Sequence, residues 1–137
     1  METEGAFSPS TVAEAQDRYE SLGSTAQVVV KEVAKAMELD ADEYERRVTG
    51  EVVETARDVL FAESLAVTVG TREEFEAWRA DADHEVDIIG SENVEQVAWH
   101  APAFSDTAVV ATFHAERAAA VGTLRRQAFG RLYSEVV

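Results

Sequence analysis

The sequence predicts an α+β fold with N-terminal helices, a small sheet of three or four strands and a long C-terminal helix. Three observations lead to this prediction. Between residues 8 and 62, apolar residues recur with the 3.6-residue period of amphipathic helices. Between residues 65 and 113, short apolar runs end at glycine or at a turn, which is typical of strands. Residues 115–135 then return to the helical period.

The helix starts are the clearest local signals. A small polar residue stands just before each helical run, in several cases with a capping-box partner three positions later. The predicted N-caps are Ser8, Ser24, Asp40, Thr49 and Thr71, and Gly23 is the predicted stop of the first helix. On the second helix, the predicted apolar face consists of Val29, Val33, Ala36 and Met37, with Val30 at its margin.

The predicted strands are 65–69, 86–89 and the two arms of a hairpin that turns near Pro102–Asp106. The connection between the first two is long enough for a helical crossover, so they could pair in parallel. In the hairpin, we expect a core face of Val97, Trp99, Val109, Ala111 and Phe113, with Trp99 opposite Val109. The reverse face, Ala98, His100, Ala108 and Val110, is apolar for a solvated surface and predicts a cover by other helices or by a second subunit.

Length and composition favour one cytoplasmic domain over residues 1–137. The chain has no cysteine, which excludes disulfides and thiolate metal sites. It has no apolar run of membrane-spanning length, and its acidic N-terminus does not resemble a secretion signal. The net charge is −15, and only Lys31 and Lys35 are lysines. Such a surface is typical of adaptation to molar salt, where self-repulsion is screened.

Three segments resemble a known family. They are EVVETARDVLFA (51–62), SENVEQVAWHAPAF (91–104) and LRRQAFGRLY (124–133). They are similar to segments of small acidic proteins from halophilic archaea that are classed as a domain of unknown function. The resemblance covers nearly the whole chain and implies a salt-adapted cytoplasmic protein, but it carries no activity, cofactor or catalytic residue.

One acidic segment approaches the pattern of a calcium-binding loop. Acidic residues occupy five of the ligand positions of an EF-hand, namely Asp81, Asp83, Glu85, Asp87 and Glu92. The sixth position of such a loop needs a positive φ, normally from glycine, and here it is the β-branched Val86. We therefore expect a solvated loop and a strand, and no metal or other cofactor.

The histidines give only weak signals for chemistry. His84, His100 and His114 lack the spacing that places two metal ligands on one helical face. Trp99 and His100, with Asp106 across the turn, could form a small polar site beside an aromatic wall. No positioned nucleophile accompanies the His–Asp pair, so a structural histidine or a ligand pocket is favoured over catalysis.

Arg125 falls inside the apolar stripe of the last helix, which is Val121, Leu124, Ala128, Leu132 and Val136. A charge there needs a partner. The favoured interpretation is a structural role, either an ion pair with a carboxylate such as Glu63 or an aliphatic stem that carries the charge out to solvent at the edge of the stripe. The alternative is an anion anchor in a pocket or across a dimer interface.

Three classes of function remain open. The favoured one is a non-catalytic binding or self-association domain, with a homodimer as its simplest assembly. The second is a small-molecule enzyme with a pocket around His100, Asp106 and Arg125. The third is a nucleic-acid-binding module that uses the arginines of the last helix, which is disfavoured because the chain lacks a broad basic surface.

Overall fold

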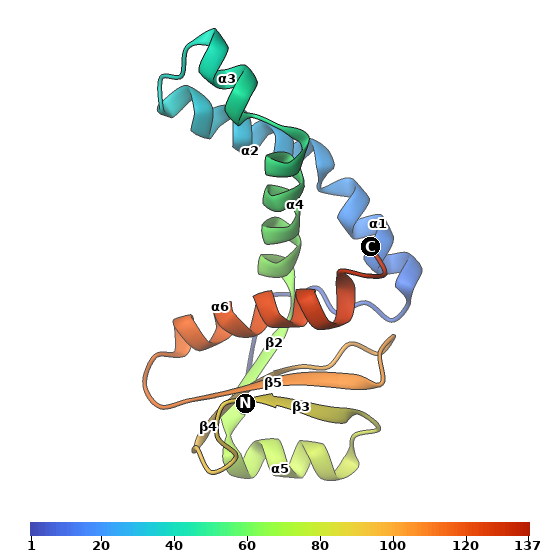
Figure 1. Ribbon diagram of the computed structural model, residues 1–137. Helices are drawn as coiled ribbons and strands as arrows, with labels where there is room; N and C mark the ends of the chain where they lie inside the picture. Colours follow the sequence, from blue (N-terminus) through green and yellow to red (C-terminus); the bar gives the residue numbers. More distant parts are fainter.

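The computed structural model describes residues 1–137 and confirms the α+β class. A sheet is covered by helices on both faces, and a helical arm projects from this body (Figure 1). The elements in chain order are β1 (Glu2–Glu4), α1 (Val12–Ser21), α2 (Gly23–Ala36), α3 (Ala41–Arg47), α4 (Gly50–Ser64), β2 (Val67–Thr71), α5 (Arg72–Asp81), β3 (Glu85–Ile89), β4 (Gln96–His100), β5 (Thr107–Phe113), α6 (Arg117–Ala128) and a π-helical turn η1 (Phe129–Tyr133).

The sheet has five strands in the order β1-β2-β4-β5-β3, one more than the expected maximum. The additional strand is β1, a three-residue edge strand whose charged sequence Glu-Thr-Glu carries no apolar pattern. The suggested parallel pairing of β2 with β3 is wrong. β2 lies antiparallel between β1 and β4, and β3 pairs in parallel with β5.

The predicted hairpin exists as β4 and β5, but its register is shifted by one residue. Trp99 lies opposite Val110, and His100 lies opposite Val109. The shift separates the expected core face into two groups, because neighbouring residues of a strand point to opposite faces. Both faces of the hairpin are buried within the chain itself, so the hairpin offers no free apolar face for a second subunit.

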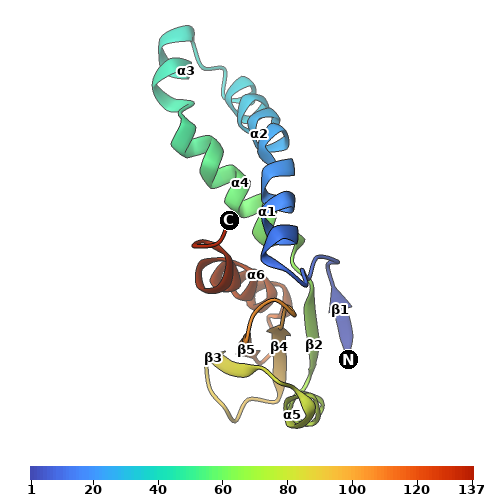
Figure 2. The same ribbon diagram turned by 90° about the vertical axis from the view of Figure 1, so that its right-hand side faces the viewer.

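The sheet lies between α6 on one side and α5 on the other (Figure 2), and two cores follow from this arrangement. The larger core lies between the sheet and the helices α4 and α6, and it contains Ala15, Phe61, Leu65, Val67, Val69, Ala98, Val109, Ala111, Val121, Leu124, Ala128 and Tyr133. The smaller core lies between α5 and the opposite face of the sheet, and it contains Phe75, Val97, Trp99 and Val110. The burial of Trp99 on the same face as Val97 was predicted correctly, but its partner across the hairpin is Val110 and not Val109.

The caps at Asp40, Thr49 and Thr71 are confirmed, since each side chain accepts a bond from the backbone N–H three residues later. The cap at Ser8 is wrong by three residues, because Thr11 caps α1. Helix α1 does end just before Gly23, as predicted, but the predicted cap at Ser24 is wrong, because α2 begins at Gly23 with Leu22 as its N-cap. Leu22 keeps helical dihedral angles, so α1 continues into α2 with only a bend between them.

The last helix ends in a widened turn. Val121, Leu124 and Ala128 are buried as predicted, whereas Leu132 and Val136 are only half-buried. The π-helical turn η1 shifts the helical phase by one residue, so that Tyr133 takes the buried position expected for Leu132. A period of 3.6 residues cannot anticipate such a turn.

Phe61 should be the main packing residue of the larger core. Its ring lies 5.6 Å from the ring of Phe7, 5.6 Å from that of Phe129 and 5.0 Å from that of Tyr133, edge-on in each case. We expect Phe61→Ala to lower the free energy of unfolding by about 3–5 kcal/mol, because it leaves a cavity. Val59→Ala, at a half-exposed position of the same helix, should cost less than about 1 kcal/mol. Urea denaturation measures both changes, and equal losses would contradict this assignment of the core.

Candidate functional site

His100 is the most deeply buried polar side chain, with 1% of its surface exposed. β4 directs it to the side of the sheet that α6 covers. Its Nδ1 lies 2.6 Å from the carbonyl oxygen of Ala66, and its Nε2 lies 2.7 Å from the hydroxyl of Tyr133. A carbonyl can only accept, so Nδ1–H donates to Ala66 and Nε2 accepts from Tyr133. The two bonds fix one neutral tautomer of the imidazole.

The surroundings keep both groups uncharged. Burial lowers the pKa of His100 to about 4, although the Ala66 carbonyl acts in the opposite direction, and the nearby charge of Arg125 lowers it further. Burial also raises the pKa of Tyr133 well above its usual value. Near neutral pH the pair therefore acts as a fixed hydrogen-bond link between β4 and η1, and the imidazole is not accessible to a ligand.

The expected polar site around Trp99, His100 and Asp106 is not assembled. Trp99 points to the opposite face of the sheet, where its ring lies 5.2 Å from Phe75 and 5.6 Å from Trp78. Asp106 is exposed at the turn between β4 and β5, and its carbonyl oxygen accepts a bond from the N–H of Glu85. The aromatic wall exists, but it is on the other side of the sheet from His100.

Arg125 is held inside the structure, with 13% of its side chain exposed. Its Nε donates to the Leu65 carbonyl at 3.0 Å, and one terminal nitrogen donates to the Glu4 carbonyl at 3.2 Å. The expected contact with Glu63 is present but long, at 3.9 Å. The guanidinium thus ties β1 and the junction between α4 and β2 to α6, mainly through backbone carbonyls.

Arginines of the C-terminal segment are largely paired within the chain. Arg117 donates to the carboxylates of Glu2 at 2.8 Å and Glu4 at 2.7 Å, which raises the pKa of the guanidinium. Arg131 donates to Asp87 at 2.6 Å. A helix that binds nucleic acid needs its arginines free and contiguous. Arg117 and Arg131 are instead paired with carboxylates of the same chain.

Within the acidic segment 81–92, residues Glu85–Ile89 form the strand β3, so the segment is not a calcium-binding loop. No group of three or more His, Asp or Glu side chains could hold a metal ion anywhere in the chain. His84 contacts the Pro102 carbonyl at 3.0 Å, and His114 is exposed.

Sequence reasoning missed two features of the helical arm. One is the exposure of the apolar face predicted for α2, because Val29, Val33 and Met37 point away from the rest of the chain with 40–54% of their surface exposed. The other is Arg57, which lies against Tyr19 and Gly23. A signal for Arg57 was available in the sequence, since Arg57 lies at helical spacing between the apolar Val53 and Leu60, much as Arg125 lies within the apolar stripe of α6.

Comparison with known families now places the chain. Residues 6–134 match a family described as a family of unknown function, DUF5809. The chain belongs to the DUF5809 family. A comparison with curated proteins and with solved structures finds no match. None of the helices in this family member combines the length and the apolar character needed to cross a membrane.

The buried imidazole should make the stability of this DUF5809 protein depend on pH. The pKa of His100 is about 4 in the folded chain and about 6.5 when unfolded, so the unfolded state binds more protons between these values. We expect this group to contribute fully above pH 6.5 and to lose about 3 kcal/mol of stability as the pH falls to 4.

The carboxylates also titrate in this range, so the measurement must compare wild type with His100→Gln by urea denaturation at several pH values. The difference in free energy of unfolding between the two proteins should shrink as the pH falls from 7 to 4. A constant difference would show that His100 does not carry this pH dependence.

Arg125→Met should test the structural role of the guanidinium. We expect it to lower the free energy of unfolding by about 2–3 kcal/mol, because the Leu65 and Glu4 carbonyls lose a charged donor. The neighbouring Arg126→Met, at an exposed position, should change it by less than about 0.5 kcal/mol. An unchanged stability of the Arg125 variant would reopen its role as a ligand anchor.

Proposed function

We propose that this DUF5809 protein is a non-catalytic binding module that self-associates through one apolar face of its helical arm. The arm consists of α2, α3 and α4, which project together from the body (Figure 1). Of the nine large apolar side chains that are exposed, seven belong to this arm: Val28, Val29, Val33, Met37, Tyr44, Val52 and Val59.

The observation that carries the proposal is that α2 buries its small side chains and exposes its large apolar ones. Its buried positions hold small or short side chains, namely Gly23, Ala26, Val30 and Ala34. Val29 and Val33 directly precede the buried Val30 and Ala34 in the sequence, and they are 40% and 54% exposed. A helix that packs only within its own chain normally buries its larger apolar side chains first. The exposed row therefore favours a partner outside the chain.

The exposed rows of α2 and α4 fall on the same side of the arm. On α4, Val53 and Leu60 share the side on which Arg57 contacts α2. Val52 and Val59 stand one position before Val53 and Leu60 in the sequence. Val29 and Val33 likewise stand one position before the buried Val30 and Ala34 of α2. One residue back along a helix is a rotation of about 100° around its axis. Because α2 and α4 run in opposite directions, this rotation brings the side chains of both rows to the same side of the pair. We call Val29, Val33, Met37, Val52 and Val59 the arm face.

A second copy of the same chain is the partner that suits this face. α2 has two lysines and one glutamate, for a net charge of +1, whereas α4 has one arginine and four acidic residues, for a net charge of −3. A two-fold pairing that lays α2 of one copy beside α4 of the other brings opposite charges together. It also converts two helical hairpins into a four-helix bundle, which gives the arm the apolar core that it lacks alone.

The available area predicts a modest affinity. Five half-exposed side chains leave roughly 150–300 Å² of apolar surface on each copy, if full burial of one covers about 60–120 Å². Pairing would then bury about 300–600 Å² of apolar surface, worth about 8–15 kcal/mol before the cost of association, which is about 4–15 kcal/mol. The gain and the cost are of similar size, so we expect a weak, concentration-dependent dimer rather than a permanent one.

We also infer that the protein works in the cytoplasm of a salt-adapted, archaeal organism. The net charge of −15 and the presence of ten arginines but only two lysines support this inference. Two copies that each carry this charge repel one another in dilute buffer. In molar salt the Debye length falls to about 3 Å, and the repulsion is screened. Association should therefore strengthen as salt rises.

Val33→Glu should abolish association, because it places an unpaired charge in the centre of the arm face. The matched control is Val28→Glu, which makes the same change on the same helix at a similar exposure, 57% against 54%, but about 140° around the axis. Sedimentation equilibrium over a wide concentration range in 0.2 M and 2 M salt measures the mass.

We expect wild type and Val28→Glu to dimerise more tightly at 2 M salt and Val33→Glu to stay monomeric. Circular dichroism should show that all three proteins are folded. A strictly monomeric wild type at both salt concentrations, or equal weakening by both substitutions, would contradict the proposal.

A further inference from the structure

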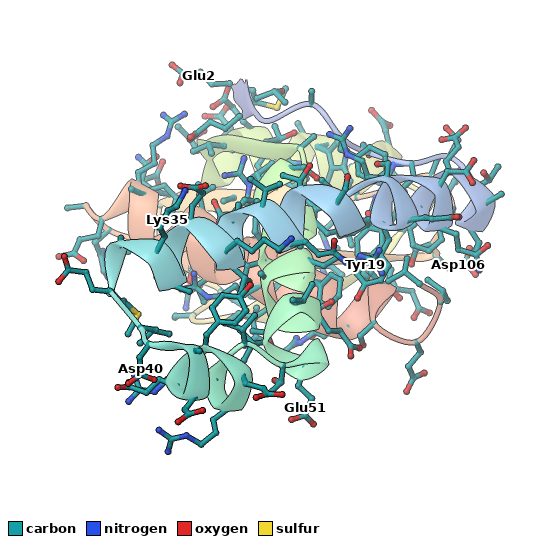
Figure 3. All side chains as sticks on the ribbon, turned by 90° about the horizontal axis from the view of Figure 1, so that it is seen from above. Glu2, Tyr19, Lys35, Asp40, Glu51 and Asp106 are labelled. Carbon is teal, nitrogen blue, oxygen red and sulfur yellow. The ribbon has the colours of Figure 1, made fainter.

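An open, shallow hollow of about 690 Å³ lies at the bend between α1 and α2 and is lined entirely by polar residues or glycine. The lining residues are Asp17, Glu20, Ser21, Gly23, Ser24, Gln27 and Arg57. Seen from above, Tyr19 lies in the angle between the α1–α2 rod and the other helices (Figure 3). We call this space the bend hollow. It lies apart from the arm face and shares no residue with it.

Arg57 is the cation of the bend hollow, and it lacks an anionic partner. Its guanidinium lies over the ring of Tyr19, 4.8 Å from the ring centre. Its Nε is shielded from solvent without a hydrogen-bond partner, and it is the only buried side-chain nitrogen or oxygen in the protein of which this is true. Such a group normally has a specific reason to be unpaired, especially in a chain with 27 acidic residues.

One acidic neighbour of Arg57 in the sequence, Asp58, is already engaged by Tyr19. Its carboxylate accepts a hydrogen bond from the Tyr19 hydroxyl at 2.7 Å. Burial, together with this bond to Asp58, raises the pKa of Tyr19 to about 12. Tyr19 thus stays protonated, holds Asp58 and presents the face of its ring to Arg57.

Gly23 leaves room for the guanidinium of Arg57. A Cβ atom at this position would overlap the Nη2 atom of Arg57. Gly23 stands in the first turn of α2, where glycine disfavours the helix relative to alanine. The close approach of Arg57 is therefore a physical reason for a glycine at this position.

We propose that the bend hollow binds a small zwitterion that carries one carboxylate and one ammonium group, as amino acids do. The carboxylate would pair with Arg57 and the hydroxyl of Ser24, and the ammonium with Asp17 and Glu20; the Ser21 hydroxyl already donates to the Arg18 carbonyl at 2.7 Å. A simple anion would be repelled by these two carboxylates, and a simple cation by the guanidinium. Only a ligand with both charges complements both sides of the hollow.

The experiment is a nuclear magnetic resonance titration of the full chain with ω-amino acids of increasing length: glycine, β-alanine, 4-aminobutyrate and 6-aminohexanoate. Butyrate and butylammonium, each carrying half of the charge pair, are the ligand controls at matched ionic strength. The observed signals are the Arg57 side-chain N–H and the amide groups of Ser21, Gly23 and Ser24. We expect saturable shifts with at least one zwitterion, at least tenfold tighter than with either half.

Two variants should abolish binding. Arg57→Met removes the cation, and its matched control is Arg18→Met, which loses a similar contact, since Arg18 lies over the Phe7 ring at 5.0 Å but does not line the hollow. Gly23→Ala retains Arg57 but displaces its guanidinium, and it favours the helix, so it should remain folded even if Arg57→Met does not. Both should weaken binding at least tenfold, and Arg18→Met less than twofold.

Other outcomes would overturn the proposal. Butyrate binding as tightly as 4-aminobutyrate would reduce the hollow to an anion site. Shifts that do not saturate with any zwitterion, or binding that survives in folded Gly23→Ala, would show that the hollow is not a ligand site.

Discussion

Two successive backbone carbonyls, those of Leu65 and Ala66, hold this structure together. They lie where the chain passes from the arm into the sheet, between α4 and β2. Leu65 accepts from the guanidinium of Arg125, and Ala66 accepts from the imidazole of His100. On the other side, the N–H of Ala66 donates to the Phe7 carbonyl at 2.8 Å. A junction that would otherwise bury unpaired polar groups is therefore fully bonded to three distant parts of the chain.

This junction explains why His100 and Arg125, two of the candidate site residues predicted from the sequence, are not available to a ligand. His100 and Arg125 come from β4 and α6, and each uses its donor on a backbone group rather than on another side chain. The Tyr133 hydroxyl then donates to the free nitrogen of His100, and the π-helical turn brings this hydroxyl into place. The unsatisfied and exposed groups are instead found on the arm, at Arg57 and along the arm face.

Much of the fold could be predicted from local sequence, because caps and helical periods are local. The caps at Asp40, Thr49 and Thr71 are of this kind. The hairpin register could not be predicted, because alanine and valine occupy both faces of β4 and β5 and the alternation gives no preference for either. The short strand β1 was also beyond prediction, since Glu2 and Glu4 are held there by Arg117, more than a hundred residues away.

The candidate site was less predictable than the fold. The burial of Arg125 and its contact with Glu63 follow from its place on an apolar stripe. The separation of His100 from Asp106 depends on how the sheet packs, which no spacing reveals. On α2 the period identified an apolar face correctly, but periodicity shows only that a face is apolar and not what covers it.

The absence of a loop at either root of the arm has a hydrodynamic consequence. α1 runs directly into α2, and α4 enters β2 with only Leu65 and Ala66 between them. The molecule is therefore a stiff, elongated particle (Figure 2). It experiences more friction in water than a sphere of its mass of 15.0 kDa, and it should leave a sizing column early even as a single copy. Elution volume will overstate its mass, whereas light scattering and sedimentation equilibrium will not.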